Sequence, residues 1–149
     1  MAREVIPIAS DHAGFELKGR LAKTLSELGY DVKDLGPDTP ASTDYADYAH
    51  PLATAVSNGD VRRGVLLCGT GLGMSYAANR HPHVRAALAW TPEIAELARK
   101  HNDANVLVLP ARFVSEDDGV AILKTWLSTP FEGGRHERRV EKIEMPEER

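Results

Sequence analysis

The chain has 149 residues, of which 42% are hydrophobic and 27% charged, and its net charge is −4. These values are typical of one globular domain, and the acidic balance argues against nucleic-acid binding, which needs a basic surface. No apolar run approaches the ~20 residues that cross a membrane, and residues 1–10 lack the apolar segment of an export signal. The single cysteine, Cys68, cannot form an internal disulfide, so we expect a cytoplasmic protein.

Short apolar runs alternate with helical patterns along the chain. The patterns predict strands at residues 5–10, 31–35, 63–68, 84–90 and 106–109. They predict helices at residues 15–28, 45–56, 74–79, 92–101 and 120–127, the last preceded by a Ser-Glu-Asp-Asp cap. Pro7 lacks a backbone donor, which conflicts with a strand inside a sheet. Strands separated by helices predict a parallel sheet covered on both faces.

The last part of the chain, from residue 133 onward, differs in composition because charges are dense and apolar residues few. By composition this tail is a solvated helix or a frayed end. The alternative is that Arg135, Arg138 and Arg139 reach back to bind an anion. Arg135 and Arg139 are four residues apart, so on a helix they share one face.

Residues 65–75, VLLCGTGLGMS, place Cys68 where a buried strand gives way to a glycine-rich loop. In parallel sheets ligands bind at the carboxyl ends of the strands. Gly69, Gly71 and Gly73 can present backbone N–H groups to an anion, such as a phosphate or an enediolate. The spacing does not fit the G-x-G-x-x-G dinucleotide motif, and the loop has no lysine of a P-loop. The loop is therefore interpreted as an anion nest without a nucleotide signature.

Cys68 itself has two interpretations. A lone cysteine is often a small buried core residue. Beside a glycine nest, however, aligned N–H groups would lower the pKa of its thiol, and a thiolate there could remove a proton next to a carbonyl. A thiol redox protein is disfavoured because there is no C-x-x-C pair.

Polar residues also follow other predicted strands. Asp11 and His12 come after the first strand, where Asp11 could cap a helix, or Asp11 could hold a sugar hydroxyl while His12 binds a phosphate. Thr43 and Asp44 precede the helix that begins at Tyr45, and capping of that helix accounts for them.

His101 begins the segment HNDAN between a helix and the fifth strand. These residues could simply form turns, but His101 is also a candidate acid or base because its charge changes near neutral pH. There is no H-E-x-x-H motif, no paired cysteines and no tight carboxylate cluster, so we expect no metal site.

Five segments in order, SDHAGFELK, TDYADYA, CGTGLGMSYAANR, RKHNDANVL and FEGGRHERRVEKI, resemble type B ribose-5-phosphate isomerases. Their relatives are the galactose-6-phosphate isomerase subunits and allose-6-phosphate isomerase. The resemblance implies a three-layer α/β/α Rossmann-like sandwich with a five-stranded parallel sheet and a C-terminal helical tail. It implies one isomerase domain over residues 1–149, whose tail from about residue 133 completes a phosphate site. It also implies no metal or organic cofactor, and a homodimer or a tetramer with active sites between subunits.

The resemblance also implies roles for the residues of the nest. Cys68 would be the base that moves a proton between C2 and C1 of the sugar. Thr70 and the backbone of Gly69, Gly71 and Gly73 would bind the enediolate oxygens. In one branch of the family a glutamate in the loop is the base instead. That position is Met74 here, so the chain resembles the cysteine branch.

Further roles implied by the resemblance concern ring opening and the phosphate. His101 would help to open the furanose ring, with Asp11 and Asn102 positioning its oxygens, and Tyr45 would line the pocket. The phosphate ligands would be His12, Arg112, Arg135 and Arg139. His101 and Asn102 are expected to come from the partner subunit.

The implied reaction is the interconversion of ribose 5-phosphate and ribulose 5-phosphate through a cis-enediolate. A complete set of site residues in one chain favours the homodimeric ribose enzyme over the two-subunit galactose 6-phosphate enzyme. The alternatives are an isomerase of a six-carbon sugar phosphate, such as allose 6-phosphate or galactose 6-phosphate, and a non-catalytic protein that binds a sugar phosphate.

Overall fold

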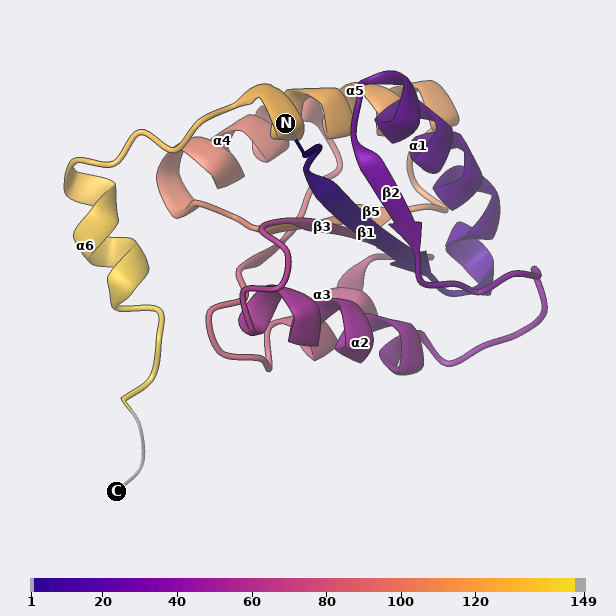
Figure 1. Ribbon diagram of the computed structural model, residues 1–149, viewed down its shortest axis with the longest axis horizontal. Coiled ribbons are helices and arrows are strands. Elements are labelled where there is room, and N and C mark those ends of the chain that lie inside the picture. Colours follow the sequence, from indigo (N-terminus) through magenta and orange to yellow (C-terminus); the bar gives the residue numbers. More distant parts are fainter. Residues whose placement is uncertain (1, 147–149) are drawn as a thin grey trace.

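The computed structural model describes residues 2–146, which form a five-stranded sheet between layers of helices (Figure 1). The strands are Val5–Ser10 (β1), Asp31–Asp34 (β2), Gly64–Cys68 (β3), Ala86–Leu88 (β4) and Val106–Pro110 (β5). The helices are Phe15–Glu27 (α1), Tyr45–Ser57 (α2), Leu72–Ala78 (α3), Pro92–Asn102 (α4), Glu116–Ser128 (α5) and Arg135–Glu141 (α6), with a 3-10 turn over His12–Gly14 (η1). Among the described residues, no helix is long and apolar enough to cross a membrane.

The sheet has the order β2-β1-β3-β5-β4, and every neighbouring pair is parallel. This confirms the predicted three-layer α/β/α arrangement. The strand order reverses between β1 and β3, so the crevice at their carboxyl ends is the topological switch point where open α/β sheets bind ligands. Asp11 follows β1 and Cys68 ends β3, so both lie at this point.

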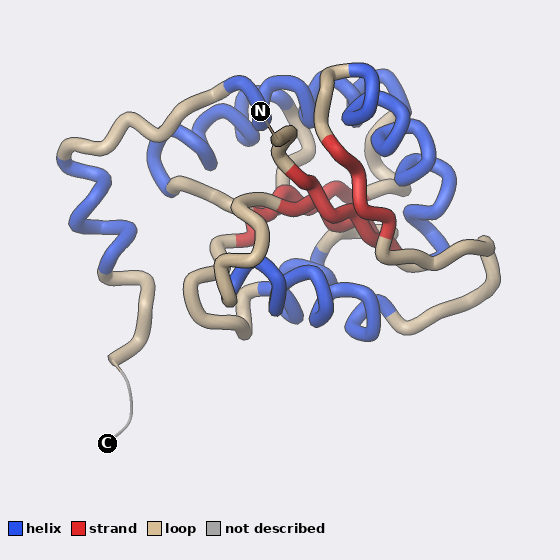
Figure 2. The backbone as a smooth tube through the Cα atoms, viewed as in Figure 1, coloured by secondary structure: helices blue, strands red, loops and turns tan. Residues whose placement is uncertain are grey.

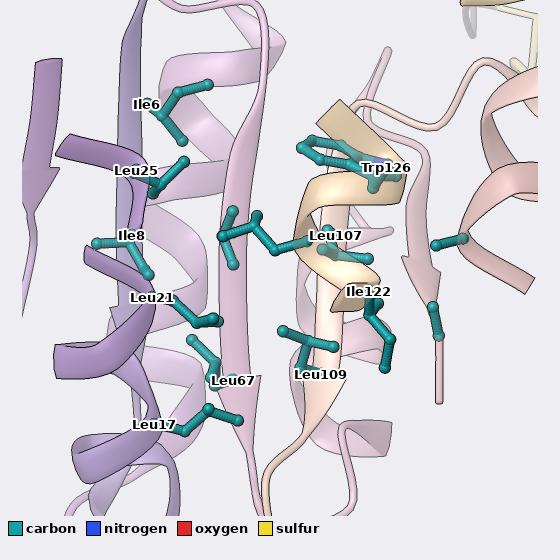
Figure 3. Packing of buried hydrophobic residues seen from close by; sticks show 14 residues of the cluster. Ile6, Ile8, Leu17, Leu21, Leu25, Leu67, Leu107, Leu109, Ile122 and Trp126 are labelled. Carbon is teal, nitrogen blue, oxygen red and sulfur yellow. The ribbon is translucent and has the colours of Figure 1, made fainter. Parts of the chain in front are cut away.

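Helices lie on both sides of the sheet (Figure 2), and a hydrophobic cluster on each face holds the layers together. On one face α1 and α5 pack against β1, β3 and β5, as Figure 3 shows for Leu21, Leu67, Leu107 and Ile122. On the other face α2 and α3 cover residues such as Leu66, and Cys68 belongs to this second cluster. Side chains of a strand alternate between faces, so β3 presents its odd-numbered residues to α1 and α5 and its even-numbered residues to α2 and α3.

The position of Pro7 removes the conflict that its missing donor raised. β1 is an interior strand, and Asp11 N–H donates to the carbonyl of Leu67 in β3. Every second backbone nitrogen of β1 points toward β3, so counting back four residues from Asp11 and Leu67 places the nitrogen of Pro7 opposite Arg63. Arg63 precedes the start of β3 at Gly64. No ladder bond is therefore lost there, and proline is tolerated.

Several element ends differ from the prediction. β4 covers only three of the residues 84–90, because it is an edge strand and Arg85 N–H donates to the side chain of Asn105 rather than to a strand. α5 begins at Glu116, four residues earlier than predicted, because the Ser115 hydroxyl accepts from Asp118 N–H and starts the helix. α6 confirms a helix in the tail, and it stands apart from the sandwich, in contact with the end of α4 (Figure 1).

Candidate active site

Cys68 is the last residue of β3 and is 4% exposed. The loop after it turns sharply into α3, whose N-cap residue Gly71 has φ +78° and no side-chain capping bond. A Cβ on Gly71 would lie 2.3 Å from Leu88 Cδ1, so both the left-handed backbone and the lack of space require glycine. The result is a short run of backbone N–H groups next to the sulfur.

Two side chains from other elements close this loop, and glycines make room for them. The Arg112 guanidinium lies against Gly69, where a Cβ would meet Nη1 at 3.1 Å, and Arg112 N–H donates to the Gly69 carbonyl. The ring of Tyr45, at the start of α2, covers Gly73 so closely that a Cβ there would lie 2.4 Å from Cε1. Four of the predicted site residues are thus in contact around the thiol.

Thr70 is exposed, and its hydroxyl oxygen accepts a hydrogen bond from Leu72 N–H at 3.2 Å. This bond orders the loop and places the hydroxyl at the mouth of the nest. A hydroxyl both accepts and donates, so Thr70 can still donate its own proton to a ligand oxygen.

The environment of the thiol corrects one expectation. Burial raises the pKa of Cys68, and this effect exceeds the lowering by hydrogen bonds from the backbone N–H groups of Met74, Gly71 and Thr70. The negative charge of Asp11 adds to the rise. In the isolated chain the pKa of the thiol is therefore raised, whereas the glycine nest alone led us to expect a lowered value. Apolar β3 and its covering helices desolvate the sulfur more than the loop compensates.

Asp11 and His12 form the turn after β1. The Asp11 carboxylate accepts from the N–H groups of Ala13 and Gly14 at 2.9 and 3.2 Å, which confirms the predicted capping role. At 7% exposure, Asp11 nevertheless contributes a negative charge within reach of Cys68. Capping and a role in the site are thus compatible.

His12 is held by Thr43 through two reciprocal hydrogen bonds. The backbone N–H of His12 donates to Thr43 Oγ1 at 3.0 Å, and the backbone N–H of Thr43 donates to the imidazole Nδ1 of His12 at 3.2 Å. An imidazole nitrogen that accepts carries no proton, so a neutral His12 has its proton on Nε2, where it can donate to an anion. Asp44 is the N-cap residue of α2, as expected, but its side chain makes no capping bond, and Thr43 binds His12 rather than the helix.

Lys18 of α1 binds the start of the loop between β2 and α2 that carries Thr43. This lysine is 2% exposed and donates to Asp34 Oδ1 at 2.7 Å and to the carbonyl of Pro37 at 2.8 Å. This ion pair between a buried lysine and a half-exposed carboxylate ties α1 to the end of β2 and to the loop that follows. The segment SDHAGFELK therefore contains both the candidate site residue Asp11 and Lys18, which holds the loop that carries Thr43.

The remaining predicted residues lie elsewhere on the chain. His101 and Asn102 end α4, which returns from the carboxyl edge of the sheet to its amino edge. Asn105, three residues later, accepts through its carbonyl from Gly64 N–H at the start of β3. Cys68 lies four residues further along that strand, about 13 Å away at ~3.3 Å per residue. Within one chain, therefore, the structure does not bring His101 to Cys68.

Arg135 and Arg139 belong to α6 and accompany His101 rather than Cys68. Both are exposed, whereas His136, which follows Arg135, is buried and stacks on the ring of His101. His101, Glu132 and His136 each place one nitrogen or oxygen atom that could bind a metal ion within 4.8 Å of the other two. No spacing motif indicates this cluster. The predicted site residues thus form two groups, one at each edge of the sheet.

Two residues of these groups escaped the reasoning from sequence. Thr43 and His12 are 31 positions apart, and nothing local in the sequence links them. His136 lies in a densely charged tail, next to Arg135, so the composition of this segment does not indicate that its side chain is buried. The only available signal was its place in the segment FEGGRHERRVEKI.

The fold and the groups at its switch point are those of a parallel α/β protein with a candidate anion-binding site at the carboxyl ends of β1 and β3. A family model described as ribose/galactose isomerase matches residues 6–143, so the chain belongs to this family. Ribose-5-phosphate isomerase B of Escherichia coli is 43% identical over 144 residues, which cover 97% of each chain.

Solved structures agree with this assignment. A ribose 5-phosphate isomerase from Thermotoga maritima is 50% identical, with a TM-score of 0.92 over 96% of this chain and 99% of the other. Ribose-5-phosphate isomerase B from Mycoplasma genitalium with bound ribulose-5-phosphate is 43% identical, with a TM-score of 0.91 over 96% and 95% of the two chains. The chain has the fold of these enzymes over nearly its whole length.

Proposed function

We propose that the chain is an aldose–ketose isomerase that interconverts ribose 5-phosphate and ribulose 5-phosphate. The observation that carries the proposal is the Cys68 sulfur at the head of a glycine nest, at the switch point of a fold shared with ribose-5-phosphate isomerases. A relative with bound ribulose-5-phosphate supports the choice of a five-carbon substrate. Both sugars are pentose phosphates, so the proposal places the enzyme in cytoplasmic pentose phosphate metabolism. We propose residues 1–149 as a single isomerase domain.

In the proposed reaction Cys68 acts as a thiolate base. It takes the proton from C2 of the open-chain aldose, the C2–H electron pair forms a double bond to C1, and O1 takes the negative charge. The proton of O2 passes to O1, and C1 then receives the proton from the thiol as the carbonyl forms at C2. Thr70 and the backbone N–H groups of Gly69, Gly71 and Gly73 donate to the oxygens as charge develops on them, which selectively lowers the barrier.

The aldose enters as a furanose, so its ring must open first. His101 would donate a proton to the ring oxygen, while Asp11 and Asn102 hold the neighbouring hydroxyl groups. The phosphate would be held by the Nε2–H of His12 and by the guanidinium groups of Arg112, Arg135 and Arg139. Binding the distant phosphate orients C1 and C2 against the sulfur.

These roles require two chains, because the residues lie at opposite edges of the sheet. Exposed apolar side chains around the carboxyl edge support such an association, since apolar patches on a surface mark contact sites. Tyr76 of α3 is 67% exposed and Phe113, after β5, is 73% exposed, and Leu72 and Trp90 are exposed as well. We propose a homodimer in which each copy supplies His101, Asn102, Arg135 and Arg139 to its partner's Cys68, with a tetramer as a pair of such dimers.

Subunit complementation tests the shared site. The variants Cys68→Ala and His101→Ala should each be inactive alone. When they are co-expressed, half of the dimers are mixed, and one of the two sites in each mixed dimer is intact, so about a quarter of the wild-type activity should return. No recovery in verified mixed dimers would show that both residues serve a site within one chain.

A substrate panel separates the proposal from its alternatives. Turnover of ribose 5-phosphate should exceed that of allose 6-phosphate and galactose 6-phosphate, and faster turnover of a hexose would reverse the substrate assignment. The Cys68→Ala variant should lose turnover but still bind ribose 5-phosphate in calorimetry. If the wild type binds the sugar phosphate without converting it, the protein is a binding module rather than an enzyme.

A further inference from the structure

His136 is the one buried residue of α6, with 6% of its surface exposed. The neighbouring Arg135, Glu137, Arg138 and Arg139 are all exposed. Within the sandwich α6 packs mainly against the end of α4, so the buried His136 is the side chain of this helix that can hold it there (Figure 1).

The contact that buries His136 is a stack on His101. The two ring centroids are 4.3 Å apart and the planes differ by 15°, which is a nearly parallel arrangement. The stack joins α6 to the last turn of α4, and the chain is also tied there by Glu132 N–H, which donates to the Lys100 carbonyl. One imidazole therefore lies between the ring-opening group and the helix that carries the proposed phosphate ligands.

Charges around His136 suit a neutral ring in this position. Burial lowers the pKa of His136, and the positive charges of His101, Arg135 and Arg139 lower it further, against a smaller opposite effect of Glu132. Glu132 Oε2 lies 3.9 Å from His136 Nε2, and the last turn of α4 also carries the cations Arg99 and Lys100. A neutral His136 can stay stacked when His101 carries a proton, whereas two imidazolium rings would repel each other.

We propose that His136 is a positioning residue whose stack on His101 makes the end of α4 and α6 one rigid unit. The unit presents His101 together with Arg135 and Arg139 to the partner's Cys68. This inference rests on the proposed function, because it assigns the purpose of the unit. His136 itself touches no reacting atom.

The test uses His136→Phe, which keeps an aromatic ring for the stack, and His136→Ala, which removes it. Arg138→Ala is the matched control, since it changes an exposed residue of the same helix. Rates are measured from ribose 5-phosphate and from ribulose 5-phosphate. The ketose cannot close a furanose ring because its O5 carries the phosphate, so only the aldose direction needs His101 for ring opening.

We expect His136→Ala to lower kcat/KM about tenfold for the ketose, the factor equivalent to about 1.4 kcal/mol and close to the upper value for a stacked pair. The equilibrium constant fixes the ratio of kcat/KM in the two directions, so kcat/KM for the aldose should fall by the same factor. The kcat from the aldose should fall several times more than the kcat from the ketose, because only the aldose direction includes ring opening. His136→Phe and Arg138→Ala should stay within about twofold of the wild type. Losses of kcat that are equal in both directions, or a Phe variant as impaired as the Ala variant, would overturn the proposal.

A readout without turnover keeps the inference separate from the proposed function. In the wild type and in His136→Phe, ring currents should shift the His101 Hε1 proton resonance upfield, and amide exchange in residues 135–141 should be slow. His136→Ala should abolish the shift and speed exchange about tenfold, for the same lost stacking energy. If the wild type does not isomerise but shows these differences, the assigned purpose fails and the stack stands. If the alanine variant shows no difference, the stack is refuted.

Discussion

Replacing Gly71 with alanine tests the anion nest most directly, because this residue combines a left-handed backbone with a missing side chain. The φ of +78° costs an alanine about 1–2 kcal/mol. The added Cβ would lie 2.3 Å from Leu88 Cδ1, and relief of such overpacking costs a further ~1–3 kcal/mol. Gly71→Ala should therefore destabilise the fold by about 2–5 kcal/mol, measured by urea unfolding. If relief of the clash displaces one donor of the nest, kcat should fall about 10²–10³-fold.

Gly59→Ala is the matched control for this experiment. Gly59 has the same φ of +78° and nothing within 4 Å of an added Cβ, so it isolates the backbone cost of about 1–2 kcal/mol. In a Leu88→Ala background the steric part should vanish, and Gly71→Ala should then cost no more than the Gly59 change. Wild-type kcat in a folded Gly71→Ala variant would refute the role of this loop in stabilising charge on the substrate.

Three further predictions concern single groups. Because burial raises the pKa of Cys68, alkylation of the free protein by iodoacetamide should still be increasing with pH above about 8.5, the ordinary pKa of a cysteine, and a plateau below that pH would contradict the raised value. Thr43→Val removes the hydroxyl that accepts from the backbone N–H of His12 and so holds this residue against the Thr43 loop. KM for ribose 5-phosphate should rise about fivefold with little change in kcat, for a lost hydrogen bond of ~1 kcal/mol, and Thr43→Ser should restore it. The hydrogen bond from Arg63 lowers the pKa of Glu4, so ionised Glu4 stabilises the fold above about pH 4.3, and this stabilisation is lost as pH falls through the lower pKa of the folded state. The free energy of unfolding of Glu4→Gln, measured in urea, should lack this pH dependence.

The parallel α/β architecture could be predicted from the sequence because each strand and helix carries its own periodic pattern. β3 is the clearest case, since Val65, Leu66 and Leu67 are buried on both faces and read as a continuous apolar run. The end of β4 could not be predicted, because Arg85 leaves the strand ladder through a bond to Asn105, which is 20 residues away.

The candidate site was predictable to the extent that its residues occur in contiguous motifs. The surroundings of those residues depend on three-dimensional packing and were less accessible. Local sequence shows the glycine donors that would lower the pKa of Cys68, but not the helices whose burial of the sulfur raises it. The partnerships of Thr43 with His12 and of His136 with His101 cross 31 and 35 positions, so no local pattern could reveal them.

The direction of the chain explains why a site that contains both Cys68 and His101 requires more than one copy of the chain. In a parallel sheet every crossover helix starts near the carboxyl ends of the strands and returns to the amino ends. A residue that ends a strand, such as Cys68, and a residue that ends a crossover helix, such as His101, therefore lie at opposite edges of one domain. A second copy that reverses the direction can bring the two edges together. A monomeric variant that keeps full turnover of ribose 5-phosphate would therefore exclude His101 from the chemistry, however well Cys68 is placed.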